Sequence, residues 1–204
     1  MERVNVELPY INKNIRWKIG VIITGNPSTR TPYEQIDITR KFEFRGELFT
    51  KVVPRFSVSI EIKKPKEENF SFENSVFIPG SFVYQFIRTL DDVIEGFQEK
   101  DLFYYDANKK LQVNKELSKR KEIRFPVGKN EIRFLYTVVA DFESETSNES
   151  TEYEGLALII NSYTNFVYLT YDEICNMRDI LKNTDFLNIS LQSILVAKTT
   201  KVEG

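Results

Sequence analysis

The stretch Ser75-Val-Phe-Ile-Pro-Gly-Ser-Phe-Val-Tyr-Gln-Phe-Ile-Arg-Thr-Leu90 decides the expected fold, because its pattern returns 91 residues later in Phe166-Val-Tyr-Leu-Thr-Tyr-Asp-Glu-Ile-Cys-Asn-Met-Arg-Asp-Ile-Leu181. Each copy begins with an apolar run typical of a strand and continues with apolar residues at helical spacing. The copies align without a gap, although few side chains are identical. Each stretch therefore predicts a strand that leads into an amphipathic helix, and the pair indicates an internal duplication. Chance similarity of two amphipathic helices is the alternative.

Start signals for both helices lie within these stretches. Pro79-Gly80 interrupts the first strand, and Ser81 is the residue expected to cap the first helix. In the second copy Thr170 is the expected cap, and Asp172-Glu173 stands in the first turn, where the positive end of the helix dipole favours acidic residues. Both helices are therefore expected to begin directly after their strands.

Residues of alternating polarity, the period of a half-buried strand, dominate the sequence ahead of each helix. The clearest case is Arg55 to Ile62, in which every second residue is apolar. The other predicted strands are Ile15 to Ile23, Gln35 to Phe44, Leu102 to Tyr105, Lys110 to Val113, Glu122 to Phe125, Glu131 to Phe142 and Gly155 to Ile160. Clusters of Gly, Asn and Pro separate them. The order predicts an α+β fold of two repeats, each an antiparallel β-sheet followed by an α-helix.

Length and composition fit one folded unit. The chain has 204 residues, of which 41% are hydrophobic and 28% charged, as in an ordinary globular protein. We expect a single domain over residues 1–204, made of a first repeat (1–100) and a second repeat with a C-terminal tail (101–204). No apolar run approaches the ~20 residues of a membrane span. The first residues resemble neither a secretion signal nor a transit peptide, so the expected location is cytoplasmic, without a membrane partner.

Residue types that the sequence lacks exclude several kinds of chemistry. There is no histidine and only one cysteine, Cys175, which excludes imidazole zinc sites, Ser-His or Cys-His nucleophile pairs and thiolate clusters. No phosphate-binding glycine motif is present. Acidic residues such as Asp91 and Asp92 occupy positions typical of a solvated helix face. We therefore expect no enzyme activity, catalytic residue, metal, cofactor or small-molecule substrate.

The net charge of -2 conceals a segregation of charge along the chain. Residues 1–66 hold 13 Lys and Arg against 7 Asp and Glu, and residues 109–133 hold 9 against 3. Residues 67–108 hold 2 against 9, and residues 141–154 hold 6 acidic residues and no basic one, which predicts a mobile acidic loop between two strands. The basic stretches precede the two helices in matching positions, so a folded duplication places them on one surface. An ordinary mixed surface is the alternative.

Aromatic residues are interleaved with the basic ones. Lys and Arg neutralise phosphates while rings stack on bases, at ~1–3 kcal/mol per stack, and this combination suits single-stranded nucleic acid. For Phe56, Phe125 and Phe134 a place in the core is favoured instead, because each continues an apolar face. The candidate nucleic-acid-binding residues are Arg16, Trp17, Lys18, Arg40, Lys41, Phe42, Phe44, Arg45, Lys51, Arg55, Arg120, Lys121, Arg124, Lys129 and Arg133.

Several antiparallel strands followed by one helix, with the unit repeated in one chain, resemble the Whirly fold of plant single-stranded DNA-binding proteins. The pattern is also similar to a fused pair of transcriptional positive-cofactor-four domains, whose last strand and helix resemble Phe166 to Leu181. The Lys-Gly-Lys-Ala-Ala-Leu motif of plant Whirly proteins is absent, so no binding residue is carried over. The resemblance implies a curved antiparallel sheet that grips single-stranded DNA, in a pseudo-dimeric chain that forms homo-oligomers.

The sequence thus predicts a non-enzymatic protein that binds single-stranded DNA or RNA with little sequence preference, in replication, recombination or transcription. The composition suits an AT-rich phage or bacterial genome, which in the phage case places the protein in the host cytoplasm. The alternative is a structural, assembly or protein-interaction protein, for example a virion component, without nucleic-acid binding. Grouping of the basic residues discriminates between them. One shared concave face for Arg40, Lys41, Arg45, Lys51, Arg120, Lys121, Arg124 and Arg133 favours binding, and scatter favours assembly.

Overall fold

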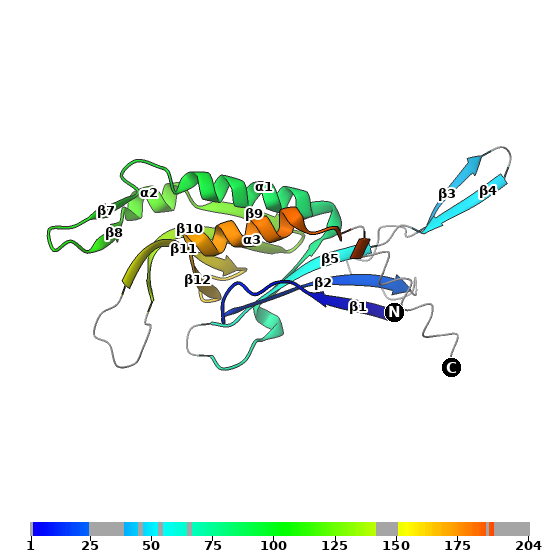
Figure 1. Cartoon of the computed structure of the whole chain (residues 1–204), viewed down its shortest axis with the longest axis horizontal. Helices are drawn as coiled ribbons and strands as arrows, with labels where there is room; N and C mark the ends of the chain where they lie inside the picture. Colours follow the sequence, from blue (N-terminus) through cyan, green and yellow to red (C-terminus); the bar gives the residue numbers. More distant parts are fainter. Residues whose placement is uncertain are drawn as a thin grey trace.

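The computed structural model describes residues 2–24, 39–44, 47–52, 55–64, 67–141, 151–186 and 188–189. Only the backbone is described for residues 2–4, 22–24, 39–44, 47–52, 55, 72 and 141. Within these ranges the chain is an α+β protein whose sheets are all antiparallel and whose α-helices are three in number (Figure 1).

The first four-stranded sheet, the N-terminal sheet, is a meander with one insertion. Its strands are β1 (Glu2–Glu7), β2 (Ile15–Thr24), β5 (Arg55–Ile62) and β6 (Ser75–Pro79). They are hydrogen-bonded neighbours in that order. A separate hairpin of β3 (Thr39–Phe44) and β4 (Glu47–Val52) is inserted between β2 and β5, and a short 3-10 helix, η1 (Phe72–Asn74), precedes β6.

The second four-stranded sheet, the C-terminal sheet, is a meander of four strands that follow one another among the described residues. Its strands are β9 (Ile123–Val127), β10 (Asn130–Asp141), β11 (Thr151–Ile160) and β12 (Phe166–Thr170). The hairpin of β7 (Phe103–Tyr105) and β8 (Leu111–Val113) and the short helix α2 (Lys115–Arg120) come before it in the chain. Each four-stranded sheet therefore ends in a strand that leads into a long helix.

The two long helices are α1 (Gly80–Gly96), which follows β6, and α3 (Tyr171–Asn183), which follows β12. Both the strand starts, Ser75 and Phe166, and the helix starts, Gly80 and Tyr171, are 91 residues apart. The prediction that both stretches form a strand followed by a helix is therefore confirmed, with the same boundary in each copy.

The two helix starts are built differently. Thr170 Oγ1 accepts a hydrogen bond from the Glu173 N–H at 3.3 Å, and the Glu173 carboxylate accepts one from the Thr170 N–H at 2.9 Å, so the predicted cap is confirmed as a capping box. The predicted cap Ser81 is wrong, because α1 begins at Gly80 after Pro79, whose side chain makes no capping bond. A Cβ on Gly80 would lie 2.7 Å from the ring of Phe56. The first residue of α1 therefore packs closely on the Phe56 ring, and the helix start has no side-chain cap.

The helices α1 and α3 lie side by side and antiparallel (Figure 1). Beyond the end of α1 the ring of Phe97 meets that of Tyr171, the first residue of α3, at 5.1 Å between centroids. At the opposite end Phe186 stacks on Phe56, the ring that covers the start of α1, at 4.9 Å. Between these ends, Asp91 of α1 pairs with two basic residues of α3, Arg178 at 3.4 Å and Lys182 at 2.9 Å.

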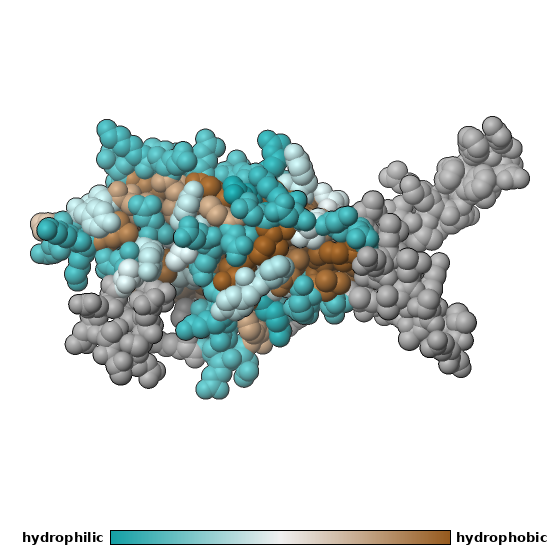
Figure 2. Space-filling model, in the orientation of Figure 1, coloured by the Kyte–Doolittle hydropathy of each residue, from teal (hydrophilic) through white to brown (hydrophobic). Residues whose placement is uncertain are grey.

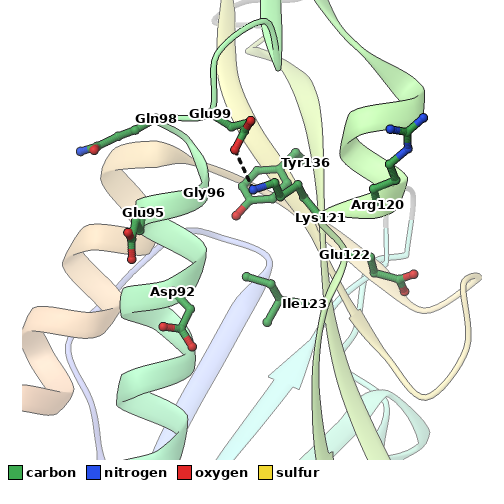
Figure 3. A pocket seen from close by; sticks show the side chains of 10 residues that line it. All are labelled: Asp92, Glu95, Gly96, Gln98, Glu99, Arg120, Lys121, Glu122, Ile123 and Tyr136. Atoms are coloured by element: carbon green, nitrogen blue, oxygen red, sulfur yellow. Dashed lines mark ion pairs between the residues drawn. The ribbon is translucent and has the colours of Figure 1, made fainter.

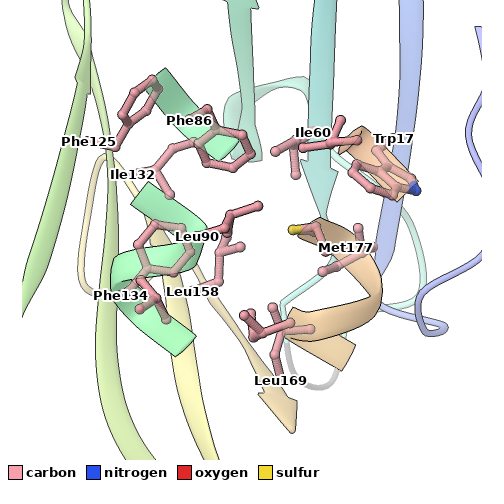
Figure 4. Packing of buried hydrophobic residues seen from close by; sticks show 14 of the residues in the cluster. Trp17, Ile60, Phe86, Leu90, Phe125, Ile132, Phe134, Leu158, Leu169 and Met177 are labelled. Atoms are coloured by element: carbon pink, nitrogen blue, oxygen red, sulfur yellow. The ribbon is translucent and has the colours of Figure 1, made fainter. Parts of the chain in front are cut away.

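One hydrophobic core serves both sheets and both helices. The ring of Phe86 in α1 lies 5.1 Å from that of Phe125 and 6.4 Å from that of Phe134, while Trp17 of the N-terminal sheet lies near Met177 of α3 (Figure 4). The predicted core positions of Phe125 and Phe134 are confirmed, and Phe56 is partly buried against the same cluster. On the face seen in Figure 2, hydrophilic residues cover most of the described surface, with apolar patches between them.

Four elements were not predicted from the sequence: β1, β4, η1 and α2. The last of these is a short helix whose start is capped by Asn114 Oδ1, which accepts from the Leu117 N–H at 3.2 Å. The predicted acidic loop, Asp141 to Glu154, lies between β10 and β11, but its ends are wrong: Asp141 closes β10, and Thr151 to Glu154 already belong to β11. Its residues 142–150 lie outside those described. None of the helices described is long and apolar enough to cross a membrane.

Candidate nucleic-acid interface

Side chains of the C-terminal sheet alternate between the core and the opposite surface, which we call the outer face. Phe134, Leu158 and Val167 point into the core from three of its strands. The neighbours of these residues define the outer face. They are Arg124 and Pro126 of β9, Glu131, Arg133, Leu135, Thr137 and Val139 of β10, Tyr153, Gly155, Ala157 and Ile159 of β11, and Phe166, Tyr168 and Thr170 of β12.

Arg133 is the best-held charge on the outer face. Its strand register places it beside Arg124 of β9. Its guanidinium carbon lies 4.0 Å from the ring centroid of Tyr163, and Nη2 donates to the backbone oxygen of Asn161 at 3.2 Å. Nε lies 2.9 Å from Glu131 Oε2 without directing its N–H at that oxygen, so this contact is an ion pair only. Arg133 is 9% exposed, so its charge interacts with groups of the protein and hardly with solvent.

Glu122, which directly precedes β9, contacts Arg133, Arg124 and Tyr163. Its Oε1 accepts a hydrogen bond from the Tyr163 hydroxyl at 3.1 Å and lies 3.9 Å from Arg133 Nη1. Its Oε2 accepts from Arg124 Nη2 at 3.1 Å, and this hydrogen bond raises the pKa of the Arg124 guanidinium. The side chain points away from α1 (Figure 3). Two carboxylates thus balance the two arginines of the outer face.

Tyr163 is a fixed aromatic ring that still meets solvent. It stands in the β11–β12 loop, where the Arg133 guanidinium lies over the ring and Glu122 holds the hydroxyl. The residue is nevertheless 54% exposed. A ring that is already immobilised loses little conformational entropy when a planar ligand stacks on it. The arrangement therefore suits stacking on a flat partner such as a nucleic-acid base.

Two further rings lie on the outer face next to this loop. Phe166 and Tyr168 project from β12, with centroids 5.1 Å apart and ring planes inclined by 59°. Tyr168 is 45% exposed. Because Phe166 pairs in register with Ile159 of β11, and Ile159 with Arg133, Phe166 lies on the same cross-strand row as Arg133, two strands away, and Tyr168 lies on the next row. The outer face thus combines exposed rings with an arginine cluster.

Seven of the predicted binding residues belong to the β3–β4 hairpin and its surroundings. The hairpin register places Arg40 opposite Lys51 and Phe42 opposite Phe49. The side chains of Arg40, Lys41, Phe42, Phe44, Lys51 and Arg55, and the whole of Arg45, lie outside the described part of the structure.

Arg16 and Lys18 project from β2 on the surface of the N-terminal sheet opposite the core, and both pair with Glu61 of β5. Trp17 does not lie on that surface, contrary to the predicted binding role of its ring. It is only 2% exposed, and its Nε1 donates to the backbone oxygen of Pro9 at 2.6 Å. The reason is parity: Trp17 has the same strand parity as buried Ile19, so its ring fills the core and cannot stack on a base.

Arg120 and Lys121 lie elsewhere, at a cavity of about 540 Å³ between α2 and the end of α1. Lys121 Nζ pairs there with Glu99 at 2.6 Å (Figure 3). Lys129 is exposed in the turn between β9 and β10. The described basic residues of the prediction thus do not share one face, because they divide among the outer face, this cavity, the N-terminal sheet and the β9–β10 turn. This scatter is the arrangement that favours an assembly protein.

Tyr163 and Glu122 were missed by reasoning from the sequence. The available signal was the single aromatic residue in the polar run Asn161-Ser-Tyr-Thr-Asn165, which has no apolar face to continue. Among the described residues, no three Asp, Glu or Cys side chains are grouped so as to hold a metal ion.

Fold and site together define an α+β protein with two four-stranded antiparallel sheets, one of which carries an arginine and aromatic cluster on its solvent side. Comparisons of the chain with protein families, with characterised proteins and with solved structures find no match.

Proposed function

We propose that this chain is a non-enzymatic protein that binds single-stranded nucleic acid, with little sequence preference, on the outer face of its C-terminal sheet. The observation that carries the proposal is Tyr163, a half-exposed ring held by Arg133 and Glu122. Every base has a flat face, so stacking on such a ring tolerates any sequence. In a duplex those faces are covered, which favours single strands.

Stacking, not charge, supplies most of the affinity in this proposal. Arg124 and Arg133 are already paired with Glu122 and Glu131, so few phosphates are neutralised by unpaired cations. Each phosphate contact contributes about 0.7 to the dependence of log K on log salt for a single strand. Arg124 is paired but its side chain is 55% exposed, so it can still reach a phosphate. With contacts by Arg124 and Lys129 alone, the slope is expected to be roughly -1.4.

The repeated architecture supports the same proposal. Both four-stranded sheets are antiparallel meanders whose last strand leads into a helix, with boundaries 91 residues apart. We infer that the halves are two copies of one strands-then-helix unit in a Whirly-like pseudo-dimer, and that the protein is cytoplasmic and forms homo-oligomers. An experimental structure in which β2 and α1 fail to superpose on β10 and α3 would contradict the repeat.

The test is a fluorescence-polarisation titration of labelled oligo-dT with protein free of copurified nucleic acid. Replacement Tyr163→Ala is expected to weaken binding by ~1–3 kcal/mol, the contribution of one base stack, without changing the salt slope. Tyr84→Ala is the matched control, because Tyr84 is a 72% exposed ring on α1 outside the outer face, and it is expected to bind like the wild type. Folded wild-type protein that fails to bind oligo-dT at low salt would disprove the function.

An assembly protein is the second candidate, and a specific observation favours it. The outer face also carries Leu135 and Val139, which are both half-buried, and the arginines beside them are paired internally. An apolar sheet surface of this kind is also suited to contact another protein. In that case Tyr168→Arg is expected to lower the mass of the oligomer measured by sedimentation. Tyr163→Ala is then expected to leave oligo-dT binding as it is in the wild type, whether the wild type binds or not.

A further inference from the structure

The N-terminal sheet holds a cluster of the same chemistry as the Tyr163 cluster. Arg16 of β2 donates from Nε to Glu61 Oε2 at 3.0 Å, and its guanidinium carbon lies 4.8 Å from the ring centroid of Phe70. Phe70 stands in the β5–β6 loop and is half-buried. Lys63 Nζ lies 5.9 Å from the same centroid. In both sheets an arginine therefore packs on a loop ring and pairs with a carboxylate.

The two arginines also occupy the same position in their sheets. Each lies on the second strand, and each ring lies in the loop between the third and fourth strands. From the residue at each strand-to-helix junction, the cross-strand partners lead to a residue of the second strand. They are Pro79, Ser57 and Gly20 in the N-terminal sheet and Thr170, Gly155 and Thr137 in the C-terminal sheet. Arg16 lies four residues before Gly20, and Arg133 lies four residues before Thr137. The two arginines thus correspond residue for residue, and each ring lies in the equivalent loop.

The helix pair relates the two halves by an approximate two-fold rotation. The helices α1 and α3 are antiparallel, and Asp91 pairs with Lys182, the residue 91 positions further on that occupies the same place in its own helix. Equivalent residues meet each other only near a two-fold axis. The Arg16 and Arg133 clusters are therefore expected to be oriented oppositely along the sheets.

We propose that the N-terminal sheet carries a second half-site for single-stranded nucleic acid, in which Phe70, backed by Arg16, stacks on one base. The inference rests on the proposed function of the Tyr163 cluster and extends it. Because a two-fold rotation reverses direction, the two half-sites bind strand segments of opposite polarity. A short oligonucleotide fills one half-site, and a long one reaches both only by turning back on itself.

The half-sites differ in how firmly their rings are held. Arg133 is almost fully buried and Tyr163 has a hydroxyl bound to Glu122, whereas the Arg16 side chain is 50% exposed and Phe70 has no hydroxyl. The better-held ring loses less entropy on binding. The Tyr163 half-site is therefore the tighter of the two.

The experiment is isothermal titration calorimetry with an oligo-dT of about six nucleotides, within the range that one single-strand binding unit covers. Wild-type protein is expected to bind two such oligonucleotides per chain. Phe70→Ala and Tyr163→Ala are each expected to bind one, and the double variant none. For an oligo-dT of about thirty nucleotides each single variant is expected to lose at least about tenfold in affinity, because the second contact of a bound strand is intramolecular.

Tyr84→Ala, an exposed ring of the same half, is the control and is expected to keep two oligonucleotides per chain. If Phe70→Ala fails to fold by circular dichroism, Phe70→Leu keeps the apolar volume without the ring and is expected to bind one. A wild-type stoichiometry of one, unchanged by either Phe70 variant, overturns the second half-site and leaves the Tyr163 site standing. No binding of the wild type to either oligonucleotide overturns both.

Discussion

At the scale of single residues, Gly96 and Tyr136 show how closely the halves are fitted. Tyr136 of β10 crosses to the end of α1, where its hydroxyl donates to the Val93 carbonyl oxygen at 2.8 Å. A Cβ on Gly96 would lie 1.9 Å from that hydroxyl oxygen, so only glycine leaves room for the ring. Burial, and after it the charge of Asp92, raises the pKa of Tyr136.

This raised pKa predicts a loss of stability in alkali. Below about pH 10, the pKa of an exposed tyrosine, Tyr136 is neutral in both folded and unfolded chains, and its contribution to stability is complete. Above that pH the unfolded chain releases the proton while the folded chain retains it, so the free energy of unfolding falls by up to about 1.4 kcal/mol per pH unit. Urea unfolding measured from about pH 8 to about pH 11 is expected to show this fall, and Tyr136→Phe is expected to show a shallower one.

Tyr105→Phe, at a ring that is 72% exposed, is the control and is expected to follow the wild type. Equal slopes for wild type and Tyr136→Phe would contradict the assignment.

At the scale of elements, one strand-to-helix unit occurs with two different starts. Thr170 and Glu173 satisfy the free N–H groups at the start of α3 through a capping box. Pro79 provides no side-chain cap for α1, whose first residue instead packs on Phe56. The same boundary is thus maintained by hydrogen bonding in one copy and by packing in the other.

Capping variants are expected to separate these two starts. Thr170→Ala removes the hydroxyl that accepts from Glu173, which is expected to cost about 1 kcal/mol of unfolding free energy. Ser81→Ala, the matched change in α1, removes no capping bond from an exposed site and is expected to stay within about 0.5 kcal/mol of the wild type. Chemical denaturation monitored by circular dichroism measures both. A larger loss for Ser81→Ala than for Thr170→Ala would refute this account of the helix starts.

At the scale of the whole molecule, the two halves share one core. Phe86 of the first half meets Phe125 and Phe134 of the second, and Phe97 meets Tyr136 at 5.1 Å. The helices α1 and α3 are further joined through Asp91. Neither half can bury these apolar side chains without the other.

Separate halves are therefore expected not to fold. Fragments 1–100 and 101–204 are each expected to lack a cooperative thermal transition, because the core side chains that pack against the other half would be exposed to water. Mixing the fragments is expected to restore the transition, since both contributors to the core are then present. Circular dichroism of each fragment and of the mixture measures this, with the intact chain as the reference. Cooperative unfolding of either fragment alone would show that its own core suffices.

Local patterns determined much of this fold. Arg55 to Ile62 was predicted residue for residue as β5, because strict alternation needs no tertiary information. The start of α3 followed from Thr170 and the acidic first turn, because capping is settled within a few neighbouring residues. Short or unpatterned segments such as α2 were missed, since their conformation depends on what they pack against.

The candidate site was decided by tertiary structure. A sequence shows that Arg133 is basic, but not that a loop tyrosine 30 residues away lies over its guanidinium or that Glu122 reaches both. Trp17 looked like a binding residue beside Arg16 and Lys18 until its parity placed it in the core. Sequence alone determined most of the strands, the two strand-to-helix units and their α+β order, because these depend on neighbours along the chain. Which cations are left unpaired and which rings meet solvent depends on contacts between distant segments, and only the folded chain decides them.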